Sequence, residues 1–295
     1  SLNDWVQIEN DKANDVVLTP RCVTDLMARL ARTDRNSFVW DSAMGSAGML
    51  VSALDIMERD VRENVVGRKA QEAKLAEIHA RQLLGVEILG NIYVLAVLNM
   101  ILMGDGSSNV RNDDSFEFLN KHGLPKEFPA NVFLLNPPYS APGKGLNFVA
   151  RAVGLMETGY ACVLIQENAG SGNDDGYAAE ILKKATLRAS IHMPNDLFHG
   201  KSVVQTAVYL FECGRAHEPD DEVVFVDMSE DGYKRQNRRK STSKVNLQDD
   251  GTASQRYDEV VAHALGKKSA TDYYTVENGK LLRDTVGVTG GDWAF

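Results

Sequence analysis

Cysteine and clustered histidine are scarce in this sequence of 295 residues. The three cysteines, Cys22, Cys162 and Cys213, lie far apart and form neither a CxxC pair nor a Cys/His cluster, which argues against a disulfide framework and a zinc site. The six histidines show no metal-ligand spacing either. We therefore expect no metal site, and we expect the protein to work in the reducing environment of the cytoplasm.

Positive charge is also in short supply. The chain has 32 Lys and Arg residues against 41 Asp and Glu residues, which gives a formal net charge of −9 at pH 7. A protein that binds nucleic acid through its overall charge needs a basic face that neutralises phosphates. With this composition, binding to nucleic acid would require a local basic patch on the chain or a basic partner protein. One basic run, residues 234–244, has six basic residues and no acidic one, and we interpret it as a solvated loop rather than a phosphate contact.

No uninterrupted apolar segment is long enough for a transmembrane helix. Residues 83–103 approach that length, but Glu87, Asn91 and Asn99 interrupt them, so we predict a buried strand followed by a buried helix and no membrane association. The N-terminal residues lack the charged and apolar regions of a signal peptide, and we interpret residues 1–12 as a leader or a cloning remnant. Neither GxGxxG nor the P-loop pattern occurs, so a dinucleotide or a nucleoside triphosphate is not favoured.

The sequence does contain a regular alternation of strand and helix patterns. These patterns predict a helix at residues 20–32, strands at 37–40, 83–87, 132–135 and 161–166, and further helices at 49–57, 91–103 and 148–156. Thr19 is expected to cap the first helix with its hydroxyl, with Pro20 at the first helical position. The alternation predicts an α/β fold with a doubly wound parallel sheet.

The later part of the chain breaks this alternation. Residues 189–193 and 203–211 are apolar and joined by a short connection, which suits an antiparallel pair of strands better than a helical crossover. We predict one more strand at 223–227 and a helix at 257–265, after which the sequence has little periodicity.

Three acidic groups stand where ligands bind in doubly wound sheets, at or beyond the carboxyl ends of strands. Asp41 begins the turn DSAMGSAG, in which backbone N–H groups and a helix N-terminus can approach a polar ligand. Glu87 suits the paired hydroxyls of a ribose, and Asp113 or Asp114 could accept a hydrogen bond from the amine of an adenine ring. Each also has a purely structural interpretation, as an ordinary turn or a solvated strand end.

The most specific pattern is NPPY, residues 136–139, which directly follows the apolar residues FLL. The two prolines make a rigid turn without ladder N–H groups. They do not explain the preceding Asn136 or the following Tyr139. A side-chain carbonyl and a nearby backbone carbonyl form a pair of acceptors for one NH2 group, and a tyrosine ring offers a planar partner a face for stacking.

Taken together, these patterns resemble the amino-group DNA methyltransferases, most closely the modification subunit of type I restriction-modification systems. The resemblance covers roughly residues 13–230 and includes LTP at 18–20, DSAMGSAGML at 41–50, GVEI at 85–88, DSF at 114–116 and NPPY, all in the family's order. Two positions differ from the family: Ser42 replaces a usual Pro, and Ala47 replaces a usual Gly at a position expected to require positive φ.

The resemblance implies a fold, a reaction and partners. The expected fold is the Rossmann-like methyltransferase fold, a seven-stranded, mostly parallel sheet with a late antiparallel strand, over residues 13–230, followed by a basic linker and a helical or irregular tail at 231–295. The expected reaction is transfer of a methyl group from S-adenosylmethionine to N6 of a flipped adenine. The expected partners are double-stranded DNA and a specificity subunit, with a restriction subunit as an additional candidate. The residues assigned to the cofactor are Thr19, Pro20, Asp41, Ser42, Gly45, Ser46, Glu87, Asp114 and Ser115, and those assigned to catalysis are Asn136, Pro137, Pro138 and Tyr139.

Other functions stay open at this point. NPPY also occurs in methyltransferases that modify a protein glutamine, whose side-chain amide presents the same NH2 group. A second alternative is an inactive subunit that binds S-adenosylmethionine without transferring its methyl group. An NAD-dependent oxidoreductase is disfavoured because the glycine pattern is wrong for it.

Overall fold

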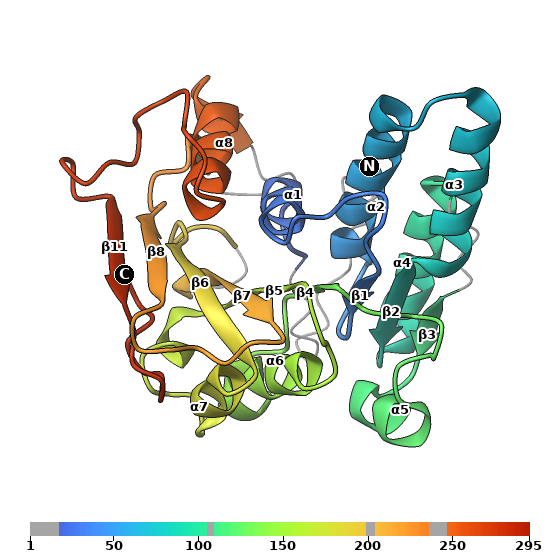
Figure 1. Ribbon diagram of the computed structural model, residues 1–295, viewed down its shortest axis with the longest axis horizontal. Helices are drawn as coiled ribbons and strands as arrows, with labels where there is room; N and C mark the ends of the chain where they lie inside the picture. The colour runs from blue at the N-terminus through green and yellow to red at the C-terminus, as the bar shows by residue number, and fades with distance from the viewer. Residues whose placement is uncertain (1–17, 105–108, 199–203, 236–246) are drawn as a thin grey trace, which may run out of the picture.

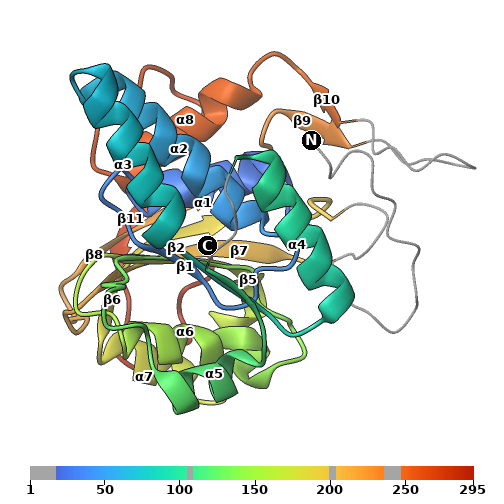
Figure 2. The same ribbon diagram turned by 90° about the vertical axis from the view of Figure 1, so that its right-hand side faces the viewer.

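The computed structural model describes residues 18–104, 109–198, 204–235 and 247–295. These residues form a single large sheet between two layers of helices (Figures 1 and 2). Nine strands of the described residues make up this sheet, in the order β11-β8-β6-β7-β5-β4-β1-β2-β3. Their bounds are β1 Val39–Asp41, β2 Leu83–Glu87, β3 Val110–Asn112, β4 Val132–Leu135, β5 Tyr160–Gln166, β6 Ala185–His192, β7 Thr206–Cys213, β8 Glu222–Asp227 and β11 Leu281–Thr285. A separate antiparallel ribbon pairs β9 (Tyr233–Arg235) with β10 (Leu247–Asp249).

The helices divide between the two faces of the sheet, as Figure 2 shows. One face is covered by α1 (Arg21–Leu30), α2 (Gly48–Asn64), α3 (Arg68–Arg81), α4 (Gly90–Leu102) and α8 (Ala253–Ala264). The other face is covered by α5 (Ser115–His122), α6 (Leu146–Val153) and α7 (Tyr177–Leu182). Short 3-10 turns, η2 (Pro142–Gly145) and η3 (Glu167–Ala169), follow β4 and β5. Each face has its own cluster of buried apolar side chains, which explains why most strands are apolar on both sides.

The predicted α/β fold class is confirmed. Strands β3, β2, β1, β4 and β5 run parallel, whereas β7 is antiparallel to both β5 and β6, as the short connection between residues 193 and 203 predicted. The expected number of seven strands is too small. Strand β8 pairs in parallel beyond β6, and β11 pairs antiparallel beyond β8. β11 escaped prediction because only Leu281 is buried along it, so it has no apolar alternation.

Residues beyond 230 share the core of the sheet. The Trp293 side chain is fully buried, and its ring lies 5.4 Å from that of Tyr209 and 5.5 Å from that of Phe211, measured between centroids. The Tyr257 hydroxyl of α8 donates to the buried Asp231 over 2.9 Å. The C-terminal segment is therefore packed against strand β7 of the large sheet. The predicted leader (1–12) and most of the basic run lie outside the described residues.

The expectation of a buried helix after β2 is wrong in part. Helix α4 buries one face against the sheet but leaves apolar side chains exposed on the other; the exposed ones are Val94, Leu98, Ile101 and Leu102. It lies beside the edge strand β3, and no described element covers its outer face. Within the described ranges, no helix combines the length and the apolar character that crossing a membrane requires.

Candidate active site

Three of the predicted site residues meet at one edge of the sheet. Asp41 ends β1, Glu87 ends β2 and Asn136 follows β4. These strands are neighbours and parallel, with β1 in the middle, so their carboxyl ends open on the same edge. The order places the Asp41 carboxyl between the other two groups.

Asp41 is a buried acid at the start of the turn into α2. Its side chain is 1% exposed, and its Oδ1 accepts a hydrogen bond of 3.0 Å from the Ala43 N–H. Burial raises the pKa of this carboxyl to about 8, and the nearby Glu87 adds to the rise. Asp41 therefore holds a proton at neutral pH until a cation reaches it.

The turn keeps the shape that glycine would give it, although Ala47 stands at its end. Ala47 has φ 67° and ψ 23°, the left-handed conformation, which costs about 1 kcal/mol for a residue with a Cβ. Gly45 also has positive φ, and the backbone of Met44 is tied to β2 by a 3.0 Å bond to the Val86 carbonyl. The carbonyl of buried Ser46 accepts from the Asn99 amide of α4 over 2.8 Å. The difference from the family at position 47 thus leaves the loop intact.

Glu87 is held by backbone donors from two loops. Its Oε2 accepts from the Gly45 N–H over 2.9 Å and its Oε1 from the Leu89 N–H over 2.8 Å. The Asn112 amide fixes the chain beside it by donating to the carbonyls of Glu87 and Ile88. Each carboxylate oxygen has a second lone pair, so Glu87 can still accept two hydrogen bonds from a ligand. The Ile88 side chain, 61% exposed, adds an apolar surface at this point.

Asp114 and Ser115 have structural partners that their sequence did not reveal. Asp114 caps α5, because its Oδ1 accepts from the N–H groups of Phe116 and Glu117. The Ser115 hydroxyl donates to the carbonyl of Ser42, which joins α5 to the Asp41 turn. The Ser42 hydroxyl is buried and has no hydrogen-bond partner among the described residues. Ser42 lies next to Phe116 and Phe148, which pack closely around it and leave no room for a ligand.

Asn136 is joined to the segment before α1. Its Nδ2 donates to the Thr19 hydroxyl over 2.9 Å, and this bond leaves the amide oxygen facing away from Thr19. The expectation that Thr19 caps α1 is therefore wrong: α1 begins at Arg21, Pro20 is the N-cap residue, and no side chain caps the helix. The hydroxyl binds a residue 117 positions away instead of its own helix.

The rest of the NPPY turn is fixed by packing. Pro137 is buried against Gly145, while Pro138 is exposed and its carbonyl accepts from the Ala141 N–H over 3.0 Å. The Tyr139 ring is half-buried and packs beside the apolar cluster under α5 and α6. Burial raises the pKa of Tyr139, and its hydroxyl is buried without a partner among the described residues. The residue also lines an open hollow next to the turn.

Comparison with known proteins identifies the family of this chain. A family model described as N-6 DNA Methylase matches residues 3–147 and 143–268. The chain belongs to this family. Among curated proteins, the type II restriction enzyme and methyltransferase RM.BcgI of Heyndrickxia coagulans is 31% identical over 229 residues, which are 74% of this chain and 34% of that protein.

Solved structures of modification subunits share the fold of this N-6 DNA methylase. The modification subunit of a putative type I restriction enzyme from Vibrio vulnificus matches with a TM-score of 0.70 and 17% identity, over 96% of this chain and 58% of that one. The M protein of the type I restriction enzyme EcoKI matches with a TM-score of 0.58 and 21% identity, over 74% of this chain and 49% of that one. The chain thus spans about a third of the curated relative and about half of these solved chains.

Two residues beside the NPPY turn escaped the sequence analysis. Gly145 packs on Pro137, and Lys144 lies beside it in a hollow that begins at Tyr139. The pattern GKG at 143–145 was the available signal, because glycines on both sides of one residue favour a turn of positive φ. No group of three or more His, Cys, Asp or Glu side chains in the described ranges could hold a metal ion.

Gly145→Ala is expected to destabilise the NPPY turn. The residue has φ 104°, and an added Cβ would lie 2.4 Å from Pro137 Cγ. We expect a loss of about 2 kcal/mol or more in the free energy of unfolding, measured by denaturant titration. Gly123→Ala is the matched control, because Gly123 also has positive φ but nothing lies within 4 Å of its added Cβ. Equal losses in the two variants would show that the contact with Pro137 contributes nothing.

Proposed function

We propose that this chain is the catalytic part of a DNA adenine-N6 methyltransferase that works as the modification subunit of a type I restriction-modification system. The observation that carries the proposal is the placement of Asn136 at the same sheet edge as Asp41 and Glu87, with its amide nitrogen bound to Thr19. This bond turns the amide oxygen, the acceptor that an amine substrate requires, away from Thr19.

The residues at this edge fit S-adenosylmethionine. The Glu87 carboxylate has two further acceptor positions for ribose hydroxyls, and the buried Asp41 carboxyl can pair with a cationic group. Gly45, Ser46, Asp114 and Ser115 shape this edge of the sheet through the bonds described above. When bound, S-adenosylmethionine supplies a methyl group on a sulfonium sulfur, which a nucleophile can displace.

The NPPY residues prepare the nucleophile. The amine of adenine is a poor nucleophile because its lone pair is delocalised into the ring. The amide oxygen of Asn136 and the carbonyl of Pro137 accept its two hydrogens and draw the nitrogen towards tetrahedral geometry, which frees the lone pair. Asn136 has no basic nitrogen, so its role is to orient the amine rather than to remove a proton, and the proton that the methylated amine loses passes to water.

The target base must leave the double helix to reach this edge. Extrusion costs a few kcal/mol, and stacking on the Tyr139 ring returns about 1 to 3 kcal/mol. The rigid prolines and the Gly145 contact keep that ring at a fixed distance from Asn136. The Asn136 amide oxygen, the Pro137 carbonyl and the Tyr139 ring together therefore favour a planar base that carries an exocyclic amine.

The acidic composition indicates that other subunits help to hold the DNA. A chain with a net charge of −9 is repelled by DNA phosphates, so it is unfavourable for this chain to bind DNA without a partner. We infer that a specificity subunit reads the DNA sequence and that a restriction subunit completes the system. The names of the similar solved structures, which are modification proteins of type I restriction enzymes, support this assignment, and the cytoplasm is the compartment in which such a complex meets its DNA.

A transfer assay tests the proposed function. The complex is purified from its native host and incubated with S-adenosylmethionine labelled in the methyl group, and with genomic DNA from a strain that lacks the gene. We expect label in N6-methyladenine after hydrolysis of this DNA, and little label when the DNA comes from the intact strain, because its sites are already modified. Label that enters protein instead of DNA would contradict the proposal.

Thr19→Val is expected to lower the rate of transfer about tenfold. Valine has the shape of threonine but cannot accept the Asn136 amide hydrogen, so the amide is free to turn. The dissociation constant for S-adenosylmethionine, measured by calorimetry, is expected to stay within about twofold. A large rise in that constant with an unchanged rate would instead make Thr19 a ligand of the cofactor.

A further inference from the structure

The turn after NPPY has an unusual backbone. Gly143, Lys144 and Gly145 have φ of 59°, 59° and 104°, so three successive residues adopt positive φ. For the two glycines this costs little, but Lys144 carries a Cβ, and its conformation costs about 1 kcal/mol. Backbone strain of this kind is retained where the surrounding structure forces it, often at ligand sites.

Contacts on both sides fix this turn relative to the proposed catalytic residues. The Gly143 N–H donates to Asp175 Oδ2 over 2.8 Å, and Gly145 packs against Pro137. A Cβ at Gly143 would lie 2.7 Å from the Asp174 carbonyl oxygen, and one at Gly145 would overlap Pro137. Lys144 is therefore the one position of the three whose side chain has room.

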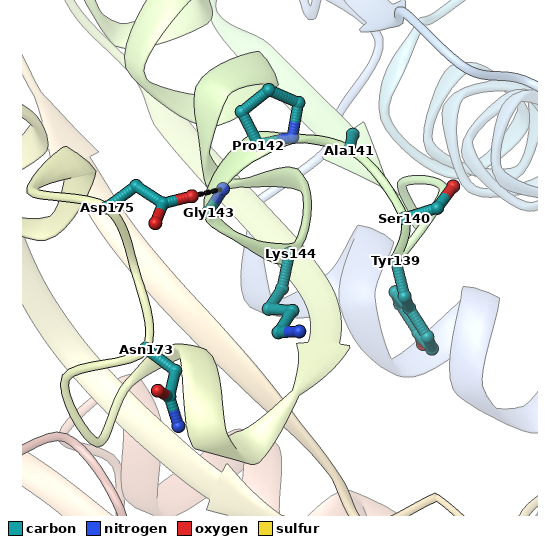
Figure 3. A pocket seen from close by; sticks show the side chains of 8 residues that line it. All are labelled: Tyr139, Ser140, Ala141, Pro142, Gly143, Lys144, Asn173 and Asp175. Atoms are coloured by element: carbon teal, nitrogen blue, oxygen red, sulfur yellow. Dashed lines mark hydrogen bonds between the residues drawn. The ribbon is translucent and has the colours of Figure 1, made fainter.

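The Lys144 side chain lies in an open hollow of about 450 Å³ that extends from Tyr139 to Asn173 (Figure 3). Lys144 is half-buried. Among the residues drawn in Figure 3 the one hydrogen bond joins Gly143 to Asp175, so the carboxylate that lines the hollow is bound to backbone and not to the ammonium. The Asn173 side chain supplies an amide on the same wall.

We propose that Lys144 binds a backbone phosphate next to the extruded adenine. This inference rests on the proposed function. A target base that stacks on Tyr139 brings its flanking phosphates to the hollow that begins at that ring. The Lys144 ammonium has no ion pair with any residue that the structure describes, and on its rigid turn it suits a single phosphate oxygen. In a chain with net charge −9, such a local cation holds the extruded nucleotide without a basic face.

The test uses the complete complex and a duplex that contains the site modified in the host. Lys144→Gly removes the ammonium at a position where glycine is favoured, so the turn is preserved. We expect the KM for the duplex to rise about tenfold, and the slope of log KM against log salt concentration to fall by about one unit, as for the loss of one phosphate contact. The rate at saturating DNA and the dissociation constant for S-adenosylmethionine are expected to change by less than about twofold. Lys144→Arg, which keeps the charge, is expected to restore the salt slope.

Two controls make the result specific. Lys126→Ala removes an exposed lysine from the loop before β4, at the opposite edge of the sheet, and is expected to leave the KM and the salt slope at their wild-type values. A series of duplexes carries one neutral methylphosphonate each, at successive backbone positions around the adenine. We expect one of these positions to raise the KM of the wild type and to leave the KM of Lys144→Gly unchanged.

A wild-type salt slope in Lys144→Gly would overturn the inference while the proposed function stands. A loss of affinity for S-adenosylmethionine without a change in the KM for DNA would also overturn it, because Lys144 would then bind the cofactor carboxylate. Absence of methyl transfer to DNA by the wild-type complex would overturn the proposed function, and this inference with it.

Discussion

Asn136→Ala is expected to lower methyl transfer to adenine about 10²- to 10³-fold, which is the effect of removing one preorganised polar group from an active site. The variant loses the acceptor that draws the amine towards tetrahedral geometry, and the Pro137 carbonyl alone cannot replace it. Cofactor binding is expected to change by less than about twofold, because Asn136 binds Thr19 and not the residues around Glu87. Single-turnover transfer and calorimetry measure the two effects separately.

Asn136→Asp tests whether an acceptor oxygen at position 136 is sufficient for activity. Aspartate keeps an acceptor oxygen and can accept a hydrogen bond from the Thr19 hydroxyl, so we expect it to retain more activity than alanine. If alanine and aspartate variants both transferred methyl groups at the wild-type rate, Asn136 would have no part in the reaction.

Asp41→Asn is expected to stabilise the ligand-free protein at alkaline pH. The folded protein keeps the proton of Asp41 up to about pH 8, whereas the unfolded chain releases it near the ordinary value of 3.8. Between these values the folded state binds one more proton, so the contribution of Asp41 to stability falls as the pH rises, by up to about 6 kcal/mol. Asparagine carries no charge at any pH and removes this loss.

The difference between wild type and variant isolates Asp41 from the other titrating groups. By urea titration, we expect wild type and variant to have equal free energies of unfolding near pH 4. The free energy of unfolding of the variant should exceed that of wild type by an amount that grows up to pH 8 and is constant above it. The same substitution is expected to weaken S-adenosylmethionine binding most above pH 8, where wild-type Asp41 is ionised and pairs with the cation. A difference in stability that does not vary with pH would show that Asp41 is already ionised in the free protein.

Which elements could be predicted depended on their apolar pattern. Strand β4 has the predicted bounds because its four apolar residues are followed at once by Asn136 and two prolines, which end the strand. Helix α3 was missed because it is polar nearly all round and buries only Ile78, so no periodicity marks it. The exposed side of α4 could not be foreseen either, since an apolar side chain looks the same in a sequence whether or not another element covers it.

In the candidate site, features that follow from neighbouring residues could be predicted, whereas contacts between residues far apart in the sequence could not. The acids at strand ends and the NPPY turn could be placed on one edge because parallel strands end together. The bond between Thr19 and Asn136 could not be predicted, because the sequence offered Thr19 a local partner at the start of α1 and nothing indicated the distant one. Lys144 was overlooked for a related reason, since its exposure depends on how two neighbouring glycines pack.

Single-molecule sequencing of genomic DNA from the native host tests the central claim most directly. The strain that lacks the gene is compared with the same strain complemented by wild type or by Asn136→Ala. We predict that N6-methyladenine disappears from one sequence context on deletion and returns only with the wild-type gene. Methylation that persists in every context after deletion of an expressed gene would contradict the account, and mass spectrometry of methylated glutamine would then test the protein-modifying alternative.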